Sequence, residues 1–388
     1  MQPRYNFRGI AANDEPFRGL ARDISAATTV DEALAAAGWN WTVHKVPYLM
    51  HGKTTDLPSR FYALVRGDNL YEIAPCSADY RPIQNCDLMA AFMGAASSAG
   101  IRITRTASLY GGARLFATAE MPLSFELNSG TILEGLNGGS VQARVHRASN
   151  GEKRGWGTDQ TVLEIVMRTG HEPGYRATVS ARVRRLVCDN GMTITAVLGS
   201  ATVVHRGREA QLKINRVAEV VSSAIDGFHL YHRQAEILRS TPSYPALDRA
   251  YVVQLLDSAA WDAIVAETQA RVTSSCTTEL TGSDLLNAVV EQTYTQRFEA
   301  ALQQRSLAAV LDAIQTQPGA DMARNTLWNT WNGLTYQVDH RAGRNIDAAV
   351  ESSLYGVGDR IKRSALDLAL VYAEAAGNPA VRGGKVVQ

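Results

Sequence analysis

The sequence predicts an α+β protein, with an antiparallel sheet body and a long amphipathic helix, followed by an α-helical C-terminal region. Two observations carry this prediction. Residues 161–190 hold two runs of alternating apolar and polar residues around the Gly/Pro-rich stretch 170–174, which indicates an antiparallel hairpin. Apolar residues then recur at spacings of three and four between residues 209 and 239, and helical patterns continue nearly to the end of the chain.

Several short elements are predicted before the hairpin. The mixed composition of residues 1–30 predicts an N-terminal arm that lies over another part of the protein. Thr29 and Glu32 have the spacing of a capping box, and the helix that they begin ends at Gly38. Strands are predicted at residues 41–48, 61–66, 101–106 and 113–120, and a helix at residues 87–98. A further short strand is predicted after the hairpin, at residues 202–206.

The second run of the hairpin has two different faces, because side chains alternate along a strand. One face carries the small apolar residues Ala177, Val179, Ala181 and Val183, which we expect to pack on the core. The other face carries Arg176, Thr178, Ser180, Arg182 and Arg184. We expect Arg182 and Arg184 to point from the sheet toward an anion.

The helical region begins after a break in the pattern. Residues 241–245 contain two prolines, interrupt the long helix and form the predicted domain boundary. Helices are predicted at residues 247–256, 259–272, 284–305, 307–316, 320–340 and 346–376. The chain is thereby divided into an N-terminal arm and helix (1–50), an antiparallel α+β domain (51–242), a helical domain (243–376) and a tail (377–388), of which residues 386–388 are predicted to be loose.

Positive charge is concentrated in one part of the chain. Residues 140–216 contain 13 Lys and Arg against 6 Asp and Glu, an excess of seven, whereas the whole chain has a net charge of only +1. A local positive field of this size favours an anionic partner such as nucleic acid. A solvated basic surface without a ligand is the alternative explanation.

Arginine and aromatic side chains of this basic segment are the predicted nucleic-acid-binding residues. Guanidinium groups suit phosphate oxygens, and they stack on bases as Trp and Tyr rings do. The predicted residues are Arg144, Arg147, Lys153, Arg154, Trp156, Arg176, Arg182, Arg184, Arg206 and Arg208, with Tyr175 as a second stacking ring. In the alternative, the arginines pair with Glu164 and Glu172, and the aromatic rings cover the sheet edge.

We find no enzyme signature in the sequence. The phosphate-binding motif G-x-x-x-x-G-K-[ST] and the nucleophile motif G-x-S-x-G are both missing. His229, His232 and Glu236 share one helical face and are a candidate metal site, although such pairs are frequent on amphipathic helices. Asp339 and His340 are adjacent and do not face each other on a helix. We therefore expect a protein that is not an enzyme and that binds no metal or cofactor.

The cysteines and the hydropathy of the chain bear on its location. Cys76, Cys86, Cys188 and Cys276 form no C-x-x-C pair, and we expect them to be reduced thiols of a cytoplasmic protein. No apolar run reaches the roughly 18 residues of a membrane-spanning helix. The first residues lack the apolar core of a signal peptide.

Four motifs resemble those of one family. They are ADYRPIQN at residues 78–85, GGARLFA at 111–117, RLVCDN at 185–190 and NTLWNTWNGLTYQVDH at 325–340. In order and spacing, from about residue 75 to 372, they resemble the phage/plasmid-like proteins of domain of unknown function 932. HEPG at residues 171–174 departs from the serine-containing S-H-D-G-S turn that is more frequent in the family, and Thr335 replaces the usual Glu. These departures argue against a catalytic role for the hairpin turn.

The resemblance implies an accessory protein of a mobile element, of the kind encoded near recombination genes. A strand-rich core followed by a long helix also resembles, at the level of the fold, the ring-forming single-strand annealing proteins. We therefore expect a protein that binds and anneals single-stranded DNA as a homo-oligomer, since annealing requires a chain to follow an extended backbone. A host single-strand-binding protein is a candidate partner.

Two other classes of function stay open. One is a non-catalytic interaction protein that modulates a host defence or restriction factor. The other is a metal-assisted hydrolase that uses His229 and His232.

Overall fold

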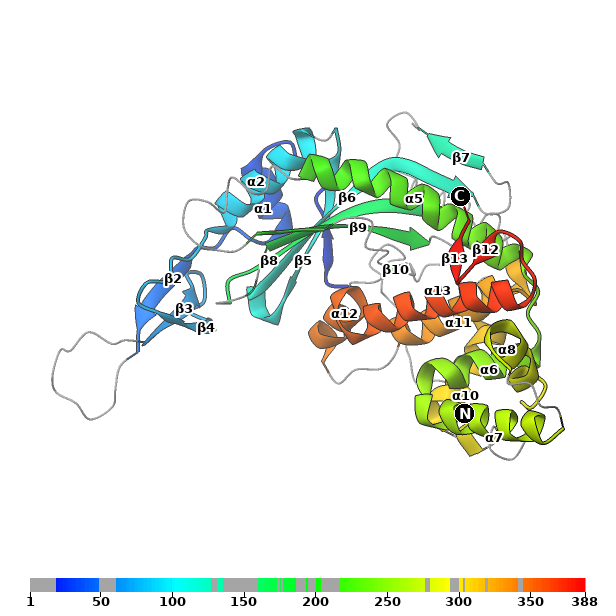
Figure 1. The fold of residues 1–388 in the computed structure, drawn as a ribbon. Helices are drawn as coiled ribbons and strands as arrows, with labels where there is room; N and C mark the ends of the chain where they lie inside the picture. Colours follow the sequence, from blue (N-terminus) through cyan, green and yellow to red (C-terminus); the bar gives the residue numbers. More distant parts are fainter. Residues whose placement is uncertain are drawn as a thin grey trace.

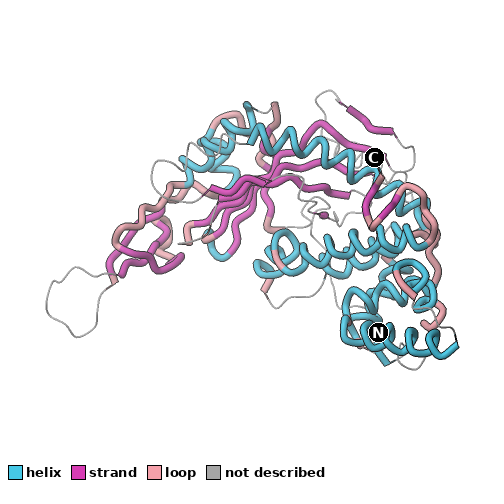
Figure 2. Tube along the Cα trace, in the orientation of Figure 1, coloured by secondary structure: helices cyan, strands magenta, loops and turns pink. Residues whose placement is uncertain are grey.

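The structure of the protein is a computed structural model. It describes residues 19–48, 61–98, 100–126, 131–134, 160–172, 175, 177–185, 193–194, 200–203, 217–275, 280–293, 300–302, 304–317, 320–340 and 345–387. The described residues form antiparallel sheets followed by a helical C-terminal region, which confirms the predicted α+β class (Figures 1 and 2). None of the described helices is both long enough and apolar enough to cross a membrane.

The large sheet forms the centre of the molecule. Its described strands are β1 (Ala21–Asp23), β5 (Arg102–Leu109), β6 (Arg114–Glu126), β7 (Thr131–Glu134), β8 (Gln160–Gly170), β9 (Ala177–Arg185), β10 (Thr193–Ile194) and β11 (Ser200–Val203). The strand order is β1-β5-β6-β8-β9-β10, with β7 paired to β6 and β11 paired to β9, and every pair is antiparallel.

The predicted central hairpin is confirmed as β8 and β9. The register runs from Thr161 opposite Arg185 to Arg168 opposite Thr178. Val179, Ala181 and Val183 are buried, as the alternation of side chains predicts for the apolar face of β9. The strand predicted at residues 202–206 overlaps β11 (Ser200–Val203), which pairs with the first part of β9, and residues 204–206 lie outside the described residues.

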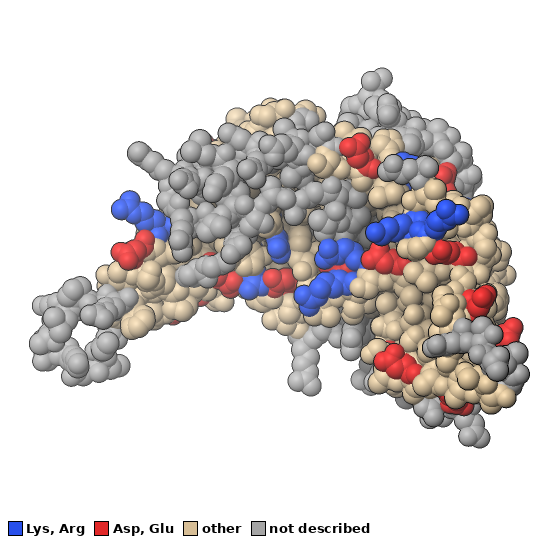
Figure 3. Space-filling model, in the orientation of Figure 1, with Lys and Arg blue, Asp and Glu red and all other residues tan. Residues whose placement is uncertain are grey.

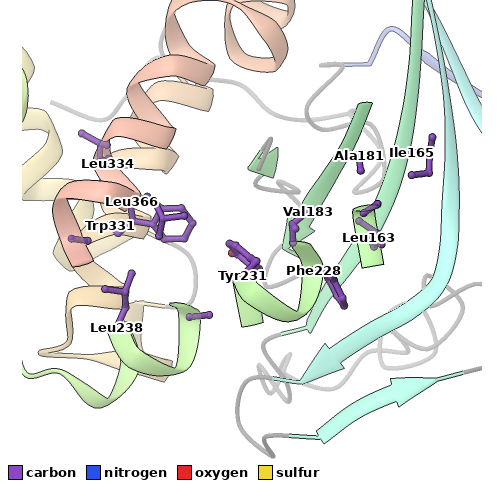
Figure 4. Close-up of a cluster of buried hydrophobic side chains, with 14 of the residues drawn as sticks. Leu163, Ile165, Ala181, Val183, Phe228, Tyr231, Leu238, Trp331, Leu334 and Leu366 are labelled. Atoms are coloured by element: carbon purple, nitrogen blue, oxygen red, sulfur yellow. The ribbon is translucent and has the colours of Figure 1, made fainter. Parts of the chain in front are cut away.

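Helix α5 (Val217–Ser240) covers the apolar face of the sheet, which we call the first face. Figure 4 shows Phe228 of α5 beside Leu163 and Val183 of this face, with Tyr231 closer to Trp331. Phe228 is fully buried, so this packing removes a large apolar area from water. Of the long helix predicted at residues 209–239, the part before residue 217 lies outside the described residues.

Two N-terminal helices, α1 (Val30–Ala37) and α2 (Asn85–Ser98), pack on the first face as well. The capping box of α1 is confirmed. The Thr29 side chain accepts a hydrogen bond from the Glu32 backbone, and the Glu32 carboxylate accepts one from the Thr29 backbone. Gly38 ends α1 with φ +68°, a left-handed conformation that favours glycine.

A small sheet projects from the body (Figure 1). It consists of β2 (Val43–Pro47), β3 (Phe61–Arg66) and β4 (Glu72–Ser77), paired antiparallel in that order. The two predicted strands of this region are therefore present. Strand β4 was not predicted, because Pro75 and the bulge opposite Leu64 and Val65 interrupt the alternation of its residues.

The C-terminal region is helical, as predicted, but its long patterns are divided. The described elements are α6 (Pro245–Leu256), α7 (Ser258–Ser275), α8 (Gly282–Val290), α10 (Arg305–Thr316), the 3-10 helix η3 (Ala320–Ala323), α11 (Leu327–His340), α12 (Ile346–Tyr355) and α13 (Val357–Ala375). The helix predicted at residues 346–376 is split because Gly356 is not helical, with φ −102° and ψ −141°. The one predicted at residues 320–340 is interrupted near Asn325, which has φ +57°.

The tail after Gly377 differs from the prediction that residues 386–388 are loose, since Val386 belongs to a strand. Strands β12 (Val381–Arg382) and β13 (Lys385–Val386) form a hairpin, and Val381 is buried in the core. The Glu374 carboxylate accepts hydrogen bonds from the backbone of Gly383 at 2.9 Å and Gly384 at 2.7 Å. This segment is therefore attached to α13 through its turn.

One hydrophobic core joins the sheet body to the helical region. It includes buried residues of β8, β9, α5, α6, α11 and α13. Tyr231 of α5 packs beside both Trp328 and Trp331 of α11, with ring centroids at 6.3 and 6.4 Å. The Pro-containing break at residues 241–245 therefore separates helices that share the same core.

Candidate functional site on the second face of the sheet

The second face of the large sheet, opposite α5, carries the charged residues of its central strands. Glu164 of β8 is paired with Glu120 of β6 on one side and with Arg182 of β9 on the other. Arg105 of β5 lies diagonally across from this row, opposite Thr118. Four ionisable side chains thus meet at the middle of a sheet, where the sequence predicts one row of solvent-facing arginines.

Arg182 does not face solvent, so this part of the prediction is wrong. Its side chain is 0% exposed, and its guanidinium group lies 2.8 Å from Oε2 of Glu164, which is also 0% exposed. The alternative explanation, in which the arginines of this strand pair with Glu164, therefore holds for Arg182. A buried ion pair of this kind requires both partners, because an unpaired charge in the interior is strongly unfavourable.

Arg105 completes a neutral network of two arginines and two glutamates. It forms ion pairs with Glu164 and, at 3.5 Å, with Glu120. Glu120 of β6 and Glu164 of β8 lie directly opposite each other on neighbouring strands, and like charges in such positions repel each other. The position of Arg105 between these carboxylates offsets their repulsion.

A second cluster of arginines and tyrosines lies at the hairpin end of the same face. The Arg114 guanidinium is 4.7 Å from the ring centroid of Tyr110 and 4.9 Å from that of Tyr175. Arg168 is 4.3 Å from the ring of Tyr355 and 5.8 Å from that of Tyr175. Tyr175, which the sequence predicts as a stacking ring for bases, is thus placed between two arginines of its own chain.

Helix α12 contributes the carboxylates that hold this hairpin-end cluster in place. Glu351 accepts a hydrogen bond from the Tyr110 hydroxyl at 3.0 Å and forms an ion pair with Arg114. Asp347 accepts a hydrogen bond from the Tyr110 backbone at 2.7 Å. Arg114 also donates to Glu172 of the hairpin turn at 2.9 Å. Apolar residues of α12 continue the contact, since Val350 and Leu354 pack on the second face.

Burial and these ion pairs change the pKa values of the cluster. Desolvation, and then the hydrogen bond to Glu351, raise the pKa of Tyr110 to about 12. Burial raises the pKa of Tyr355 further, against the charges of Arg182 and Arg168. Burial by itself lowers the pKa of Arg114, but the hydrogen bond to Glu172 and the charge of Glu351 outweigh it and raise that pKa. Both tyrosines therefore stay protonated at neutral pH, and the Tyr110 hydroxyl donates its hydrogen bond to Glu351.

Two residues of the ADYRPIQN motif, Tyr80 and Asn85, contact His171 of the hairpin turn. The Asn85 amide donates to the backbone oxygens of Trp39 and Trp41, both at 3.0 Å, so its Oδ1 atom accepts. His171 Nε2 lies 2.9 Å from that oxygen and therefore carries a proton. Tyr80 donates to the backbone oxygen of His171 at 2.9 Å. Tyr80 and Asn85 of the ADYRPIQN motif thus connect the hairpin turn to the region between α1 and the small sheet.

The Gly-Gly motif belongs to the same junction. Gly111 and Gly112 have φ +65° and +102°, and a Cβ atom on either would come within 2.6 Å of Tyr71 or Trp41, respectively. The backbone oxygen of Gly111 also accepts a hydrogen bond from Arg66 at 2.7 Å. These glycines allow the turn between β5 and β6 to approach the small sheet closely. The sequence shows the motif but not the aromatic rings that require it.

The D-H motif near the C-terminus is also structural. The buried Lys362 side chain donates to Asp339 Oδ1 at 2.7 Å, and the Ser353 hydroxyl donates to the same atom. Asp339 of α11 therefore binds α12 and α13 at the corner around Gly356. His340 points elsewhere, stacked on Tyr336 at 4.2 Å, as expected for adjacent residues of a helix. Trp328 and Trp331 of the same motif are both completely buried and pack in the core.

Most predicted nucleic-acid-binding residues lie outside the described residues. This holds for Arg144, Arg147, Lys153, Arg154, Trp156, Arg176, Arg206 and Arg208. Arg184 belongs to β9, but its side chain is not described. On the face drawn in Figure 3, the Lys and Arg side chains of the described residues lie near Asp and Glu, so this part of the surface has mixed charge.

The candidate metal residues of α5 do not come together as a site. His232 is 3.5 Å from Glu236, and burial lowers the pKa of His232 against the opposing effect of Glu236. No group of three His, Cys, Asp or Glu side chains that could hold a metal ion occurs within the described part of the chain. Of the four cysteines, the described Cys76 and Cys86 are free thiols.

One family matches the chain in comparisons with known proteins. The family model described as "Domain of unknown function (DUF932)" matches residues 73–355. This range contains all four resemblance motifs and both clusters of the second face. No curated protein matches the chain, and no solved structure matches it.

Proposed function

The chain belongs to the DUF932 family, and we propose that it binds single-stranded DNA and anneals complementary strands. The observation that carries this proposal is the excess of seven positive charges in residues 140–216. Arg182 and Glu164 remove one charge of each sign from this segment, so their ion pair leaves the excess unchanged. Glu172 is paired with Arg114, which lies outside the segment. An excess of this size favours binding to phosphates.

The topology supports a role in following an extended strand. Residues 135–159 and 186–192 are joined to the end of the sheet where Gln160 pairs with Glu126, and Thr161 with Arg185. Residues 204–216 follow Val203, which pairs with Ala177 at the opposite end of β9. These ends are separated by about 26 Å at the usual rise of a strand. In this proposal, a single strand that contacts basic residues of these segments passes from one end of the sheet to the other.

The fold is also compatible with the annealing proteins in a general sense. A meander of long antiparallel strands is followed by one long helix across its apolar face, as in the fold-level analogy drawn from the sequence. Such an analogy leaves the activity open. In this proposal the protein is a cytoplasmic homo-oligomer of a phage or mobile element, and a host single-strand-binding protein is a candidate partner.

The test is DNA binding by charge-removal variants, measured by fluorescence anisotropy with a labelled single strand at several salt concentrations. Lys153→Ala/Arg154→Ala and Arg206→Ala/Arg208→Ala should each weaken binding. The salt slope is the steepness with which the logarithm of the binding constant falls against the logarithm of the salt concentration. Each lost phosphate contact reduces this slope by roughly 0.7, so each double variant should lower it by about 1.4. The loss should be similar for unrelated sequences, because phosphate contacts carry no base information.

The matched control is Arg271→Ala/Arg382→Ala, which removes two exposed arginines outside the basic segment. It makes the same change in net charge and should keep the salt slope within error. Annealing is then measured with two complementary labelled strands. If the wild-type protein fails to bind a single strand at low salt, or if the control loses as much as the two test variants, the proposal is wrong.

A further inference from the structure

The small sheet has one face that is turned away from the body. We call it the outer face and define it by His44, Val46 and Tyr48 on the β2 side, Phe61, Ala63 and Val65 of β3, and Glu72 and Pro75 of β4. Ala63, in the middle of this face, is itself buried. Phe61, Val46 and Tyr48 are 62%, 43% and 37% exposed. The opposite face carries Val43, Leu64 and Cys76, which are buried in the main core. An apolar face of this kind on a projecting sheet marks an interaction site.

The edges of the small sheet are less suited to association than its face. Pro47 at the end of β2 and Pro75 within β4 lack the backbone N–H that a further strand would need. Prolines on edge strands are one of the ways in which proteins prevent edge-to-edge pairing. The available surface is therefore the outer face.

The charges of this face favour a protein partner over nucleic acid. None of the residues that define the outer face is Lys or Arg, and Glu72 would repel phosphate. The ionisable side chains are His44 and Glu72, which flank Val65 in a single row across the three strands. Tyr48 reaches across the face and donates a hydrogen bond to Glu72, which places both side chains on the same side of the sheet.

This row is complementary to a second copy of itself. If two outer faces stack with a two-fold axis parallel to β3, then β2 of one copy lies opposite β4 of the other. His44 then faces Glu72 of the second copy, and the symmetry repeats this contact. Phe61 lies on the central strand next to the axis. Two sheets packed face to face are about 10 Å apart, a distance that Phe, Val and Tyr side chains can fill.

We propose that the outer face of the small sheet is a two-fold interface between copies of this chain, with Phe61 beside its two-fold axis at one end and two His44–Glu72 contacts at the other end. This inference assigns a surface to the homo-oligomer described above. It rests on the small sheet alone, without any contribution from DNA binding.

The experiment is sedimentation velocity of the full-length protein without nucleic acid, over a range of concentrations. Phe61→Glu should raise the dimer dissociation constant at least about tenfold, because it places two carboxylates in an apolar interface. Leu70→Glu is the matched control. Leu70 is 76% exposed and lies in the turn between β3 and β4, off the outer face, so this variant should dimerise like the wild type.

A charge exchange tests the orientation. His44→Glu and Glu72→Lys should each weaken the dimer, and the double variant His44→Glu/Glu72→Lys should restore it to within about threefold of the wild type. A monomeric wild-type protein, or equal effects of Phe61→Glu and Leu70→Glu, would overturn the proposal. So would a double variant that is weaker than both single variants. DNA binding of the Phe61→Glu monomer by anisotropy is a separate measurement, so failure of the interface can be told from failure of the proposed function.

Discussion

At the scale of single residues, the alternation of side chains along β9 correctly predicts which face carries Arg182, but it does not predict that this side chain is buried. It alternates with Ala181 and Val183 as expected, yet it is as completely buried as they are. Its carboxylate partner Glu164 also binds Arg105, so three charges of the network depend on each other. Such a network contributes to stability only while every member is present.

We therefore predict that Arg182→Ala destabilises the protein by about 3–5 kcal/mol, because Glu164 is left buried with one fewer partner. Urea unfolding followed by circular dichroism measures the change. The double variant Arg182→Met/Glu164→Gln should lose less stability than the summed losses of the single variants Arg182→Met and Glu164→Gln. The difference should be roughly 0.5–3 kcal/mol. Arg233→Ala, at an exposed position of α5, is the control. An Arg182→Ala protein of wild-type stability that binds DNA less tightly would support the original solvent-facing interpretation instead.

At the scale of elements, α12 connects the helical region to the second face of the sheet. Its polar contacts use Asp347 and Glu351, and its apolar contacts use Val350 and Leu354. Glu351 is 22% exposed and binds two side chains of the β5–β6 turn region, Tyr110 and Arg114. Glu351 therefore joins α12 to two side chains next to the sheet, and Asp347 adds a hydrogen bond from the Tyr110 backbone.

Replacing Glu351 by Gln should remove the ion pair with Arg114 while keeping the size of the side chain. We expect a loss of about 1–3 kcal/mol in stability and faster amide hydrogen exchange in residues 346–355, because α12 opens more often. Hydrogen exchange read by mass spectrometry tests this. Asp262→Asn, an exposed carboxylate on α7, should leave α12 unchanged. Unaltered exchange in the Glu351→Gln protein would mean that the apolar contacts alone hold the helix.

At the scale of the whole molecule, one core unites the sheet and the helices, and several tyrosines are buried within it. Burial raises the pKa of Tyr80 to about 12, and it raises the pKa values of the fully buried Tyr251 and Tyr372 well above their usual range. The native protein thus keeps phenol protons that the unfolded chain releases near pH 10. Because the unfolded state then binds fewer protons, stability falls as the pH rises through this range.

We predict a steep loss of stability between about pH 10 and pH 12, coincident with the rise of tyrosinate absorbance. Urea midpoints at a series of alkaline pH values measure this. Tyr251→Phe should make the pH dependence shallower, whereas Tyr244→Phe, at an exposed position, should not. The prediction is wrong if the buried tyrosines ionise near pH 10 while the protein is still folded.

The sequence by itself determined the features that depend on neighbours along the chain. The capping box at Thr29, the pairing of the alternating runs as β8 and β9, and a helix over residues 217–239 were all predicted and are present. Each of these signals arises within a few residues, because capping geometry and side-chain periodicity are local properties. The assignment to one family also came from short motifs, and the family match confirms it.

Only the tertiary structure decided what covers each surface. Alternation shows which residues of β9 share a face, but the second face is covered in part by α12, whose residues come more than 160 positions later in the chain. The burial of Arg182, the requirement for Gly112 beside Trp41 and the splitting of the last helix at Gly356 all result from such distant contacts or from a single backbone conformation. Periodicity carries no information about them, because burial is set by packing partners that are remote in sequence.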